Sequence, residues 1–360
     1  MTSERIEVDY TIASGDPLEV ADAIRVEQTI EFPLDLAADW IQEQVVGHVE
    51  AISDRLVTIS YDQGVAGGGL TQLLNVLWGN VSLFPDVRIT TVRLPDSYLS
   101  GFPGPRFGIQ GLRELLDVPD APLTCTAVKP MGTSPQDLGR MAATLARAGF
   151  HIIKDDHGLA DQPWARWTER IAVIAEHVNE AAEHAGTRAL YMPSLNVPAD
   201  RIVDAAYEAK AAGAGALLVL PGISGFDAMR NLAADDQLSL PIMAHPSFLG
   251  SNVVNPRQGM GHGVLFGTLM RVAGADISIF PNYGGRFSFT REQCRDIQSA
   301  CHARLGQVAP SWPSPGGGMT LDRLAEIVDF YGNDVALLIG GALHRGDLGD
   351  NAEQMIAALS

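Results

Sequence analysis

The chain has 360 residues, of which 46% are hydrophobic, and its 43 acidic and 25 basic residues give a formal net charge of −18. The length allows one large domain beside a smaller one, and the acidic excess argues against nucleic acid and anionic membranes as partners. No apolar run reaches the roughly 18 residues needed to span a bilayer, and the first residues lack the apolar core of a signal peptide, so we expect a cytoplasmic protein. The three cysteines do not have the spacing of metal ligands, so we expect free thiols, with Cys125 in the core.

Residues 1–115 predict a small α+β domain, for which we expect a ferredoxin-like arrangement. Ser14 or Asp16 would cap the first helix. The Pro/Gly-rich stretch 101–105 is typical of a hinge, and we place the domain boundary after residue 115. The expected elements are, in chain order, a helix over 16–25, a hairpin formed by 45–52 and 56–61, a helix over 69–77 and a strand over 87–94.

Residues 116–360 alternate between strands and helices eight times, which predicts a (β/α)8 TIM barrel rather than an open sheet. Glycines before several of the strands fit helix C-caps and are expected to be structural. The expected strands are 123–129, 151–156, 188–195, 216–220, 241–245, 276–280, 308–314 and 335–339, and the expected helices are 135–148, 164–185, 199–212, 224–234, 264–273, 291–305, 321–331 and 351–359.

Charged side chains follow the first two barrel strands at the point where each strand ends. Lys129 follows the first strand, and Lys154, Asp155, Asp156 and His157 end the second. A barrel of this kind places its catalytic groups at the carboxyl ends of its strands. Because side chains alternate along a strand, Lys154 and Asp156 would point into the barrel and Asp155 outward toward the helices. The alternatives are a solvated strand end with local ion pairs and a surface position for Lys129.

An inward lysine beside an inward aspartate in a dry pocket is either an ion pair or part of a metal site. A neutral lysine amine reacts with carbon dioxide to give a carbamate, which is an anionic oxygen ligand. A carbamate on Lys154 together with Asp156 would suit Mg²⁺, a hard ion that prefers oxygen. Lys129 would then serve as a proton donor or acceptor.

Glycine pairs follow the last two strands of the predicted barrel, at Gly316-Gly317 and Gly340-Gly341. The loops after strands seven and eight form the usual phosphate site of such barrels, because glycine lets backbone N–H groups approach an oxyanion closely. With Arg286 after strand six, these loops predict a phosphate site. His245, at the end of strand five, fits a structural core histidine as well as a functional one.

Several motifs follow one another along the chain: Gly79-Asn80-Val81, Gly104 to Gln110, Lys129-Pro130, Gly149 to Asp156, Gly316-Gly317 and Gly340-Gly341. In this order they resemble the large subunit of ribulose-bisphosphate carboxylase/oxygenase, and more closely the RuBisCO-like proteins of form IV. The similarity covers nearly the whole chain and implies a small N-terminal domain, a (β/α)8 barrel, and a homodimer in which one subunit's N-terminal domain caps the other's barrel. It also implies a divalent cation and a sugar phosphate as substrate.

The resemblance also implies roles for individual residues in catalysis, in binding of metal and phosphate, and in contacts across the dimer. Lys154 matches the family's carbamylated lysine, Asp156 matches a metal ligand, and Lys129 matches the acid/base lysine. His245 matches the histidine of strand five, and Arg286 lies at about the position of the mobile-loop lysine of carboxylases. The phosphate loops are matched by Gly316, Gly317, Gly340 and Gly341, and the residues that reach across the dimer are matched by Glu27 and Asn80.

The chain also departs from the family pattern. The family's third metal ligand is a glutamate, and this chain has His157 at that position. Imidazole is a poor ligand for Mg²⁺. Either water fills the position, or another divalent cation binds, or the metal is held differently. Met131 replaces the second lysine of the family's Lys-Pro-Lys motif, and Pro246 replaces an arginine. Carbon dioxide fixation on ribulose bisphosphate is therefore not expected, and the loss of cations on one side fits a substrate with a single phosphate.

What remains is machinery to form an enolate beside a metal ion. The run from Lys154 to Gln162 resembles the RuBisCO-like proteins of apiose breakdown, which implies decarboxylation, or transcarboxylation and hydrolysis, of 3-oxo-isoapionate 4-phosphate. We expect this reaction, with Lys129 as proton donor to the enolate and His157 as ligand or proton relay, because it needs no base strong enough to abstract a carbon-bound proton. The alternatives are an isomerase or enolase acting on 5-methylthioribulose 1-phosphate or a related ketose phosphate, and a non-catalytic sugar-phosphate-binding protein.

Overall fold

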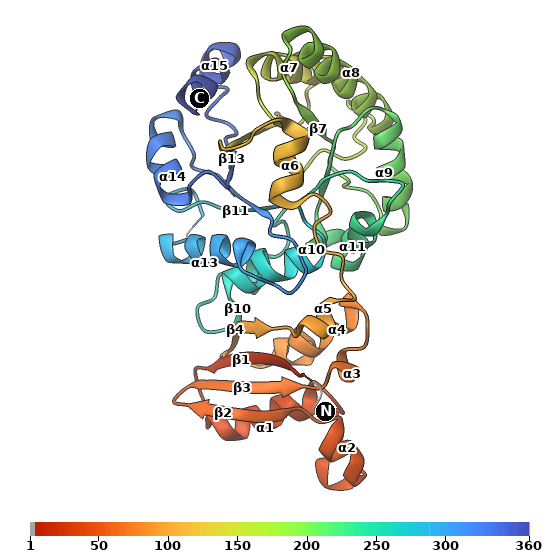
Figure 1. Ribbon diagram of the computed structural model, residues 1–360, viewed down its shortest axis with the longest axis vertical. Helices are drawn as coiled ribbons and strands as arrows, with labels where there is room; N and C mark the ends of the chain where they lie inside the picture. Colours follow the sequence, from red (N-terminus) through yellow and green to blue (C-terminus); the bar gives the residue numbers. More distant parts are fainter. Residues whose placement is uncertain (1–3, 288, 360) are drawn as a thin grey trace.

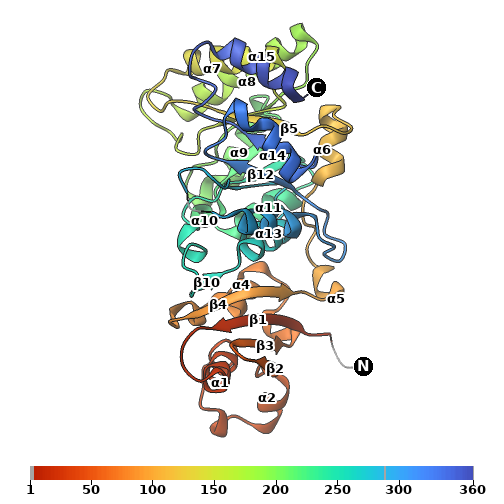
Figure 2. The ribbon, with the colours of Figure 1, turned by 90° about the vertical axis from the view of Figure 1, so that its left-hand side faces the viewer.

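The computed structural model of the protein describes residues 4–287 and 289–359. Figure 1 shows two parts, a large ring of strands and helices above and a smaller sheet with its helices below. The N-terminus lies in the smaller part and the C-terminus near the far end of the larger one, and the turned view in Figure 2 shows the same elongated arrangement. The predicted barrel with a smaller N-terminal α+β domain is therefore confirmed.

The larger part is a barrel of eight parallel strands. The residues of β5 are all buried, as expected for parallel strands that have side chains packed on both faces. The strands follow one another in the order β7-β6-β5-β13-β12-β11-β9-β8, and a parallel bridge between Ser194 and Leu218 joins the two ends of this order. The strands are β5 (Leu123–Val128), β6 (Ile152–Asp155), β7 (Leu190–Met192), β8 (Leu217–Val219), β9 (Ile242–Ala244), β11 (Ile277–Pro281), β12 (Trp312–Gly316) and β13 (Ala336–Leu338).

Helices surround this barrel (Figure 1), and both ends of α7 are capped. The side chain of Ser134 accepts the Asp137 N–H at the start of α7, and Gly149 ends that helix at a φ of 98°. The predicted helix over 264–273 is a π-helix (Val264–Leu269) followed by a short α-helix. The helices are α7 (Pro135–Ala148), α8 (Trp167–Ala185), α9 (Ile202–Ala211), α10 (Pro221–Ser224), α11 (Phe226–Ala234), α12 (Met270–Val272), α13 (Arg291–His302), α14 (Leu324–Tyr331) and α15 (Leu348–Leu359).

The smaller part is built on a sheet with the order β10-β4-β1-β3-β2. Its first strand, β1, was not among the predicted elements, although its alternation of apolar and polar residues is a signal that could have found it. Asp16 caps α1, as predicted, by accepting the N–H groups of Leu18 and Glu19. The elements are β1 (Ile6–Ile12), α1 (Pro17–Glu27), α2 (Asp39–Gln44), β2 (His48–Ser53), β3 (Leu56–Tyr61), α3 (Gln63–Ala66), α4 (Leu70–Trp78), β4 (Val87–Arg93) and α5 (Asp96–Leu99).

The two parts share a sheet edge. The strand β10 (Gly259–Met260) comes from the chain between β9 and β11, and it pairs in parallel with Arg88 and Ile89 of β4. Arg88 also donates to the carbonyl of Asn255 at 2.7 Å. A segment more than 160 residues away in the sequence thus completes the N-terminal sheet, which no local pattern predicts.

A further helix, α6 (Gly108–Leu116), was also not predicted, and it closes the amino-terminal end of the barrel. Its buried side chains Leu112 and Leu116 pack in one cluster with the inward residues of the barrel strands. Asp276 fixes the start of this helix, because one of its carboxylate oxygens accepts the Phe107 and Gly108 N–H groups at 2.7 and 2.8 Å.

The seventh barrel strand lies later in the sequence than predicted. The expected range was 308–314, whereas β12 spans Trp312–Gly316 and pairs with β11 along its whole length. The prolines at 313 and 315 obscured this strand, because proline is uncommon inside a sheet. The correction places Gly316 at the end of the strand and Gly317 in the loop. Among the described residues, no helix has the length and hydropathy needed to cross a membrane.

Candidate active site at the carboxyl ends of the barrel strands

Parallel pairing of β5 with β6 brings the two predicted strand-end lysines together. Ala127 is the register partner of Lys154. The chain that leaves β5 then carries Lys129 to Asp156, with 3.2 Å between the Lys129 Nζ and the Asp156 Oδ2. The two amines therefore lie within the electrostatic reach of one carboxylate.

Asp155 points away from these groups, as the alternation of side chains predicts. Its carboxylate is completely buried and contacts Arg170 of α8 at 3.2 Å. It also accepts the hydroxyl of Tyr191 at 2.9 Å and the backbone N–H of Ser194 at 3.1 Å. These three donors from α8 and from β7 with its following loop hold the end of β6, so that Lys154 and Asp156 are turned to the opposite side.

The Lys154 amine is enclosed, with the residue only 3% exposed, and it donates to the backbone carbonyl of Asp155 at 3.1 Å. Burial lowers the pKa of Lys154, and the positive charge of Lys129 lowers it further, against the opposing charges of Asp156 and Asp155. The neutral amine is the form that can accept a proton or react with carbon dioxide. Cys125 is buried, as predicted, and its pKa is raised to about 12 by burial, so it is a neutral thiol.

Asp156 is the carboxylate that the site presents. Partial burial raises its pKa, but the Gly158 N–H and the charges of Lys129 and Lys154 outweigh this effect and lower the pKa overall. The Gly158 N–H donates to Oδ1 at 3.1 Å, while Oδ2 faces Lys129. Asp156 is therefore an ionised group that can hold a cation.

His157 and His245 form a stacked pair of imidazole rings, with 4.1 Å between centroids and 14° between planes. The Asn196 amide donates to the backbone carbonyl of His157 at 3.2 Å, which fixes the main chain that carries the first ring. Burial is the main cause that lowers the pKa of both histidines, and nearby lysine charges add to it. Two neutral rings can stack without charge repulsion. His157 also lies 3.5 Å from Asp156 through Nδ1.

The glycine loops lie beside one another and beside Lys129. A Cβ added at Gly318, whose φ is 71°, would come within 2.3 Å of the Gly285 Cα, so only glycine allows this approach of backbones. A Cβ added at Gly340 would lie 3.5 Å from the Lys129 Nζ. The loops after β11 and β12 are thus packed together. The loop after β13 adjoins the group formed by Lys129, Lys154 and Asp156, which we call the acid–base cluster.

Two arginines lie near these loops. Arg286, which the sequence singled out, packs over the ring of Phe287, and its charge contributes to the lowered pKa of His157. Arg323 was missed. It donates to the carbonyl of Gly318 at 3.2 Å and lies 3.3 Å from Glu326. The position of Arg323 just before α14, five residues after Gly318, was the signal that could have found it.

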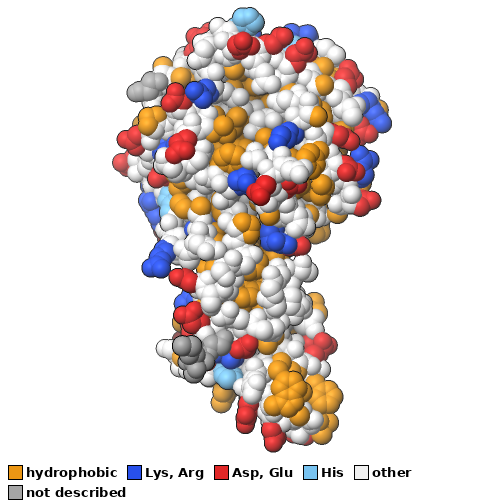
Figure 3. Space-filling view, turned by 45° about the vertical axis from the view of Figure 1, so that its right-hand side comes forward, with side chains coloured by type: hydrophobic (Ala, Val, Ile, Leu, Met, Phe, Trp, Pro, Cys, Tyr) orange, Lys and Arg blue, Asp and Glu red, His pale blue; other side chains and the backbone are white. Residues whose placement is uncertain are grey.

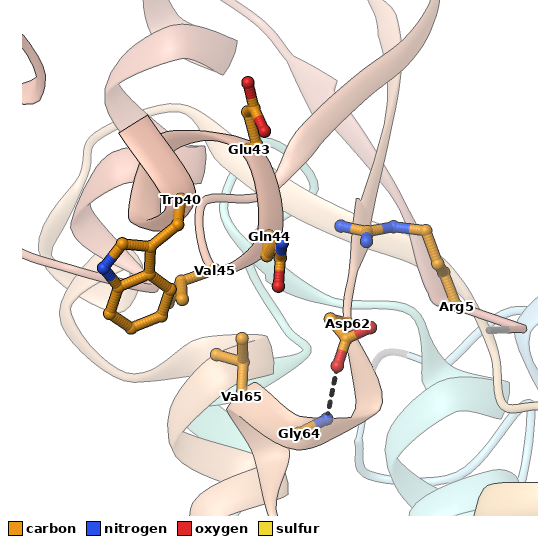
Figure 4. A pocket seen from close by; sticks show the side chains of 8 residues that line it. All are labelled: Arg5, Trp40, Glu43, Gln44, Val45, Asp62, Gly64 and Val65. Carbon is orange, nitrogen blue, oxygen red and sulfur yellow. Dashed lines mark hydrogen bonds between the residues drawn. The ribbon is translucent and has the colours of Figure 1, made fainter. Parts of the chain in front are cut away.

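Glu27 and Asn80 are not in this cluster. They lie in the N-terminal domain, where the Asn80 amide donates to the Glu27 carboxylate at 2.8 Å, and Figure 1 shows α1 below the barrel. A cavity of about 420 Å³ also lies in that domain, between α2 and the start of α3. Figure 4 shows its lining side chains, among them Trp40, Glu43 and Asp62. It contains no lysine and no histidine, so it offers no acid–base pair like that of the barrel.

The candidate site offers few side-chain donors to a divalent cation. Within the described residues, no three histidine, cysteine or carboxylate side chains are grouped closely enough to hold a metal ion. Asp156 and His157 supply two donors, and a hard cation prefers oxygen. The set fits such a cation only when the Lys154 amine carries a carbamate, and the enclosed position and lowered pKa of that amine are compatible with this modification.

A (β/α)8 barrel with a small N-terminal α+β domain and charged side chains at the carboxyl ends of its strands is the architecture of a barrel enzyme. The model of the ribulose bisphosphate carboxylase large chain, catalytic domain, matches residues 108–282. A ribulose bisphosphate carboxylase-like protein 1 of Rhodopseudomonas palustris is 38% identical over 350 residues, which cover 95% of this chain and 93% of that protein. The chain therefore belongs to the RuBisCO large-chain family and is a RuBisCO-like protein of form IV.

Two further relatives agree with this assignment. A 5-methylthioribulose-1-phosphate isomerase of Rhodospirillum rubrum is 35% identical over 350 residues, which cover 95% of this chain and 92% of that one. The crystal structure of a Rubisco-like protein from Rhodopseudomonas palustris superimposes with a TM-score of 0.89 at 35% identity, over 99% of this chain and 98% of that chain. These similarities support an enzymatic role for the chain.

Replacing Arg170 with methionine should destabilise the protein by roughly 3–5 kcal/mol, because it leaves the buried Asp155 carboxylate without its cation. Urea denaturation followed by circular dichroism would measure the change. The matched control is Arg140→Met, whose ion pair with Asp137 is exposed and should be worth less than about 1 kcal/mol. Equal effects of the two substitutions would show that the Asp155–Arg170 pair does not hold β6.

Proposed function

We propose that this protein is an enzyme that forms an enolate from a ketose monophosphate or a sugar-acid monophosphate, and that it is not a carbon dioxide-fixing carboxylase. The observation that carries the proposal is the ion pair of Lys129 with Asp156, a carboxylate whose charge also acts on the buried Lys154 amine, beside glycine loops. Binding of a sugar phosphate does not need such an acid–base pair. Enolate chemistry does, because a proton must be removed from or delivered to carbon.

The residues of this chain divide the work by position. Lys129, paired with Asp156 and next to Gly340, would deliver a proton to the enolate carbon or oxygen. Lys154, whose enclosed amine has a lowered pKa, would act as the base or carry a carbamate. Gly316, Gly317, Gly340 and Gly341 would present backbone N–H groups to the single phosphate, with Arg286 nearby.

A divalent cation, Mg²⁺ or another, would be held by Asp156, by a carbamate on Lys154 and by His157. When bound, such an ion polarises the ketone oxygen on which negative charge develops. His157 would alternatively pass a proton, since its Nδ1 lies 3.5 Å from Asp156. We also propose a cytoplasmic location, which the relative named as a 5-methylthioribulose-1-phosphate isomerase supports.

Two substrates follow from two different observations. The relative named as a 5-methylthioribulose-1-phosphate isomerase favours isomerisation of that ketose phosphate, with proton removal by Lys154. The replacement of a ligand carboxylate by His157, and the run from Lys154 to Gln162, favour decarboxylation of 3-oxo-isoapionate 4-phosphate, in which loss of carbon dioxide makes the enolate and Lys129 protonates it. The two reactions leave different products.

Incubation of the purified protein with each substrate in deuterium oxide separates the reactions. Carbon dioxide release from the sugar-acid phosphate supports the lyase, and an isomerised product from the methylthio-ketose phosphate supports the isomerase.

Lys129→Met should lower kcat for the active substrate by about a hundredfold, because a positioned proton donor is lost. Lys210→Met, on the outside of α9, is the control and should leave kcat unchanged. Tight binding without turnover of either substrate would indicate a sugar-phosphate sensor instead.

Carbamylation of Lys154 can be tested directly, because the chain has only three lysines, Lys129, Lys154 and Lys210. With ¹³C-bicarbonate and Mg²⁺, we expect one carbamate carbon signal in the NMR spectrum. The signal should disappear in Lys154→Met and persist in Lys210→Met. A signal that survives the loss of Lys154, or no signal at any bicarbonate concentration, would contradict the proposed metal site.

We further propose a homodimer in which Glu27 and Asn80 of one subunit approach the barrel of the other. The exposed side chains Phe32, Leu36 and Trp40 lie around α2, and Figure 3 shows hydrophobic side chains gathered at this lower end of the molecule. Such an apolar surface is typical of a protein contact.

A mixing experiment tests the shared site. Glu27→Ala and Lys129→Met should each be nearly inactive, but after subunit exchange the mixed dimers have one intact site, so about a quarter of the parent activity should return. Sedimentation would confirm that dimers form. Mixed dimers that remain inactive would show that Glu27 does not act on the partner's barrel.

A further inference from the structure

The hydrogen bonds at His245 define which of its ring nitrogens carries the proton. The backbone N–H of Ser247 donates to Nδ1 at 3.2 Å, and the Ser247 hydroxyl lies 2.8 Å from the same atom. A backbone N–H can only donate, so Nδ1 must be the acceptor. In the neutral ring, the proton then lies on Nε2, across the ring from Ser247.

The chain makes this contact through a strained turn. The Leu249 N–H donates to the Pro246 carbonyl at 3.1 Å, which closes a four-residue turn with Ser247 second and Phe248 third. Phe248 has a φ of 71°, which a type II turn requires at its third position and which glycine usually supplies. A bulky residue in this region costs energy, and such strain is typical of functional sites. The turn returns the Ser247 donors to the His245 ring.

The other face of His245 is also fixed. Its ring stacks on that of His157, and both Lys129 and Lys154 are close enough for their charges to act on it. The two hydrogen bonds that the ring of His245 makes within the described residues both involve Nδ1. Nε2 therefore remains available to a bound molecule.

We infer that Ser247 is a positioning residue that fixes His245 as the Nε2–H tautomer, so that this ring serves as a hydrogen-bond donor to the oxygen on which charge develops, rather than as a proton acceptor. The inference rests on the proposed enolate chemistry for its catalytic consequence. The tautomer itself is a property of the free protein and can be measured without a substrate.

Three substitutions at one position grade the effect. Ser247→Thr keeps both donors, Ser247→Ala keeps only the backbone N–H, and Ser247→Pro removes both. Proline is common at the second position of a type II turn, so the last variant should keep the turn. Ser251→Ala, an exposed serine in the same loop, is the matched control. Thermal denaturation would verify that each variant is folded.

Long-range ¹H–¹⁵N NMR correlations at a fixed neutral pH report the tautomer of His245, assigned with a His245→Gln variant. In the parent protein and in Ser247→Thr, we expect a single Nε2–H form. In Ser247→Pro, we expect an Nδ1–H population to appear, with Ser247→Ala between the two. With the active substrate, kcat should fall about tenfold in Ser247→Pro, as expected for a lost hydrogen bond to a developing charge, while KM changes little.

An Nδ1–H tautomer in the parent protein would overturn the inference, as would a folded Ser247→Pro variant with an unchanged tautomer and unchanged kcat. Lack of turnover with either candidate substrate, together with the expected tautomers, would instead count against the proposed function and leave the positioning role of Ser247 in place.

Discussion

The buried pairing of Asp155 with Arg170 is the interaction on which the candidate site depends. Three consecutive charged residues end β6, and a buried charge without a partner would cost several kcal/mol. Arg170, Tyr191 and the Ser194 N–H satisfy the outward carboxylate from two neighbouring elements. Because side chains alternate along a strand, fixing the outward residue also fixes the inward direction of its two neighbours. The acid–base cluster therefore depends on a contact that takes no part in the chemistry.

The distribution of cations gives the site its electrostatic character. The chain carries a net charge of −18, and only three of its 25 basic residues are lysines. One of these lysines, Lys129, pairs with Asp156, and the charge of that carboxylate also acts on the buried amine of Lys154. Arg286 and Arg323 lie near the adjoining loops. This local group opposes the field of the whole protein, so an anionic substrate would be held where the cations and backbone amides converge. The enclosed amine of Lys154 loses hydration there, which lowers its pKa.

The departure from the family pattern at His157 changes how the site is organised. Where the resemblance places a carboxylate ligand, this chain has an imidazole that stacks on His245. The lowered pKa of both rings keeps them neutral, and the Ser247 turn orients the second ring. Under the proposed function, Asp156 and a carbamate on Lys154 would be the oxygen ligands of the cation. The imidazole at position 157 would then alter both the affinity for that cation and the supply of hydrogen-bond donors.

Local patterns in the sequence were sufficient to predict the barrel, because strands buried on both faces must be continuously apolar. They were also sufficient to predict the charged strand ends, because a charged residue can end such a strand only at a loop. Long-range pairing was not available to them: β10 completes a sheet from a distant segment, and the prolines of β12 hid its range. The strand-end lysines were foreseen, whereas Arg323 and the Ser247 contact were not. Which groups the rim can contain follows from the amino-acid sequence alone, since strand ends and glycine loops are local features. Which of these groups meet depends on the folded chain, because β-strand register and side-chain direction are set by partners far away in the sequence.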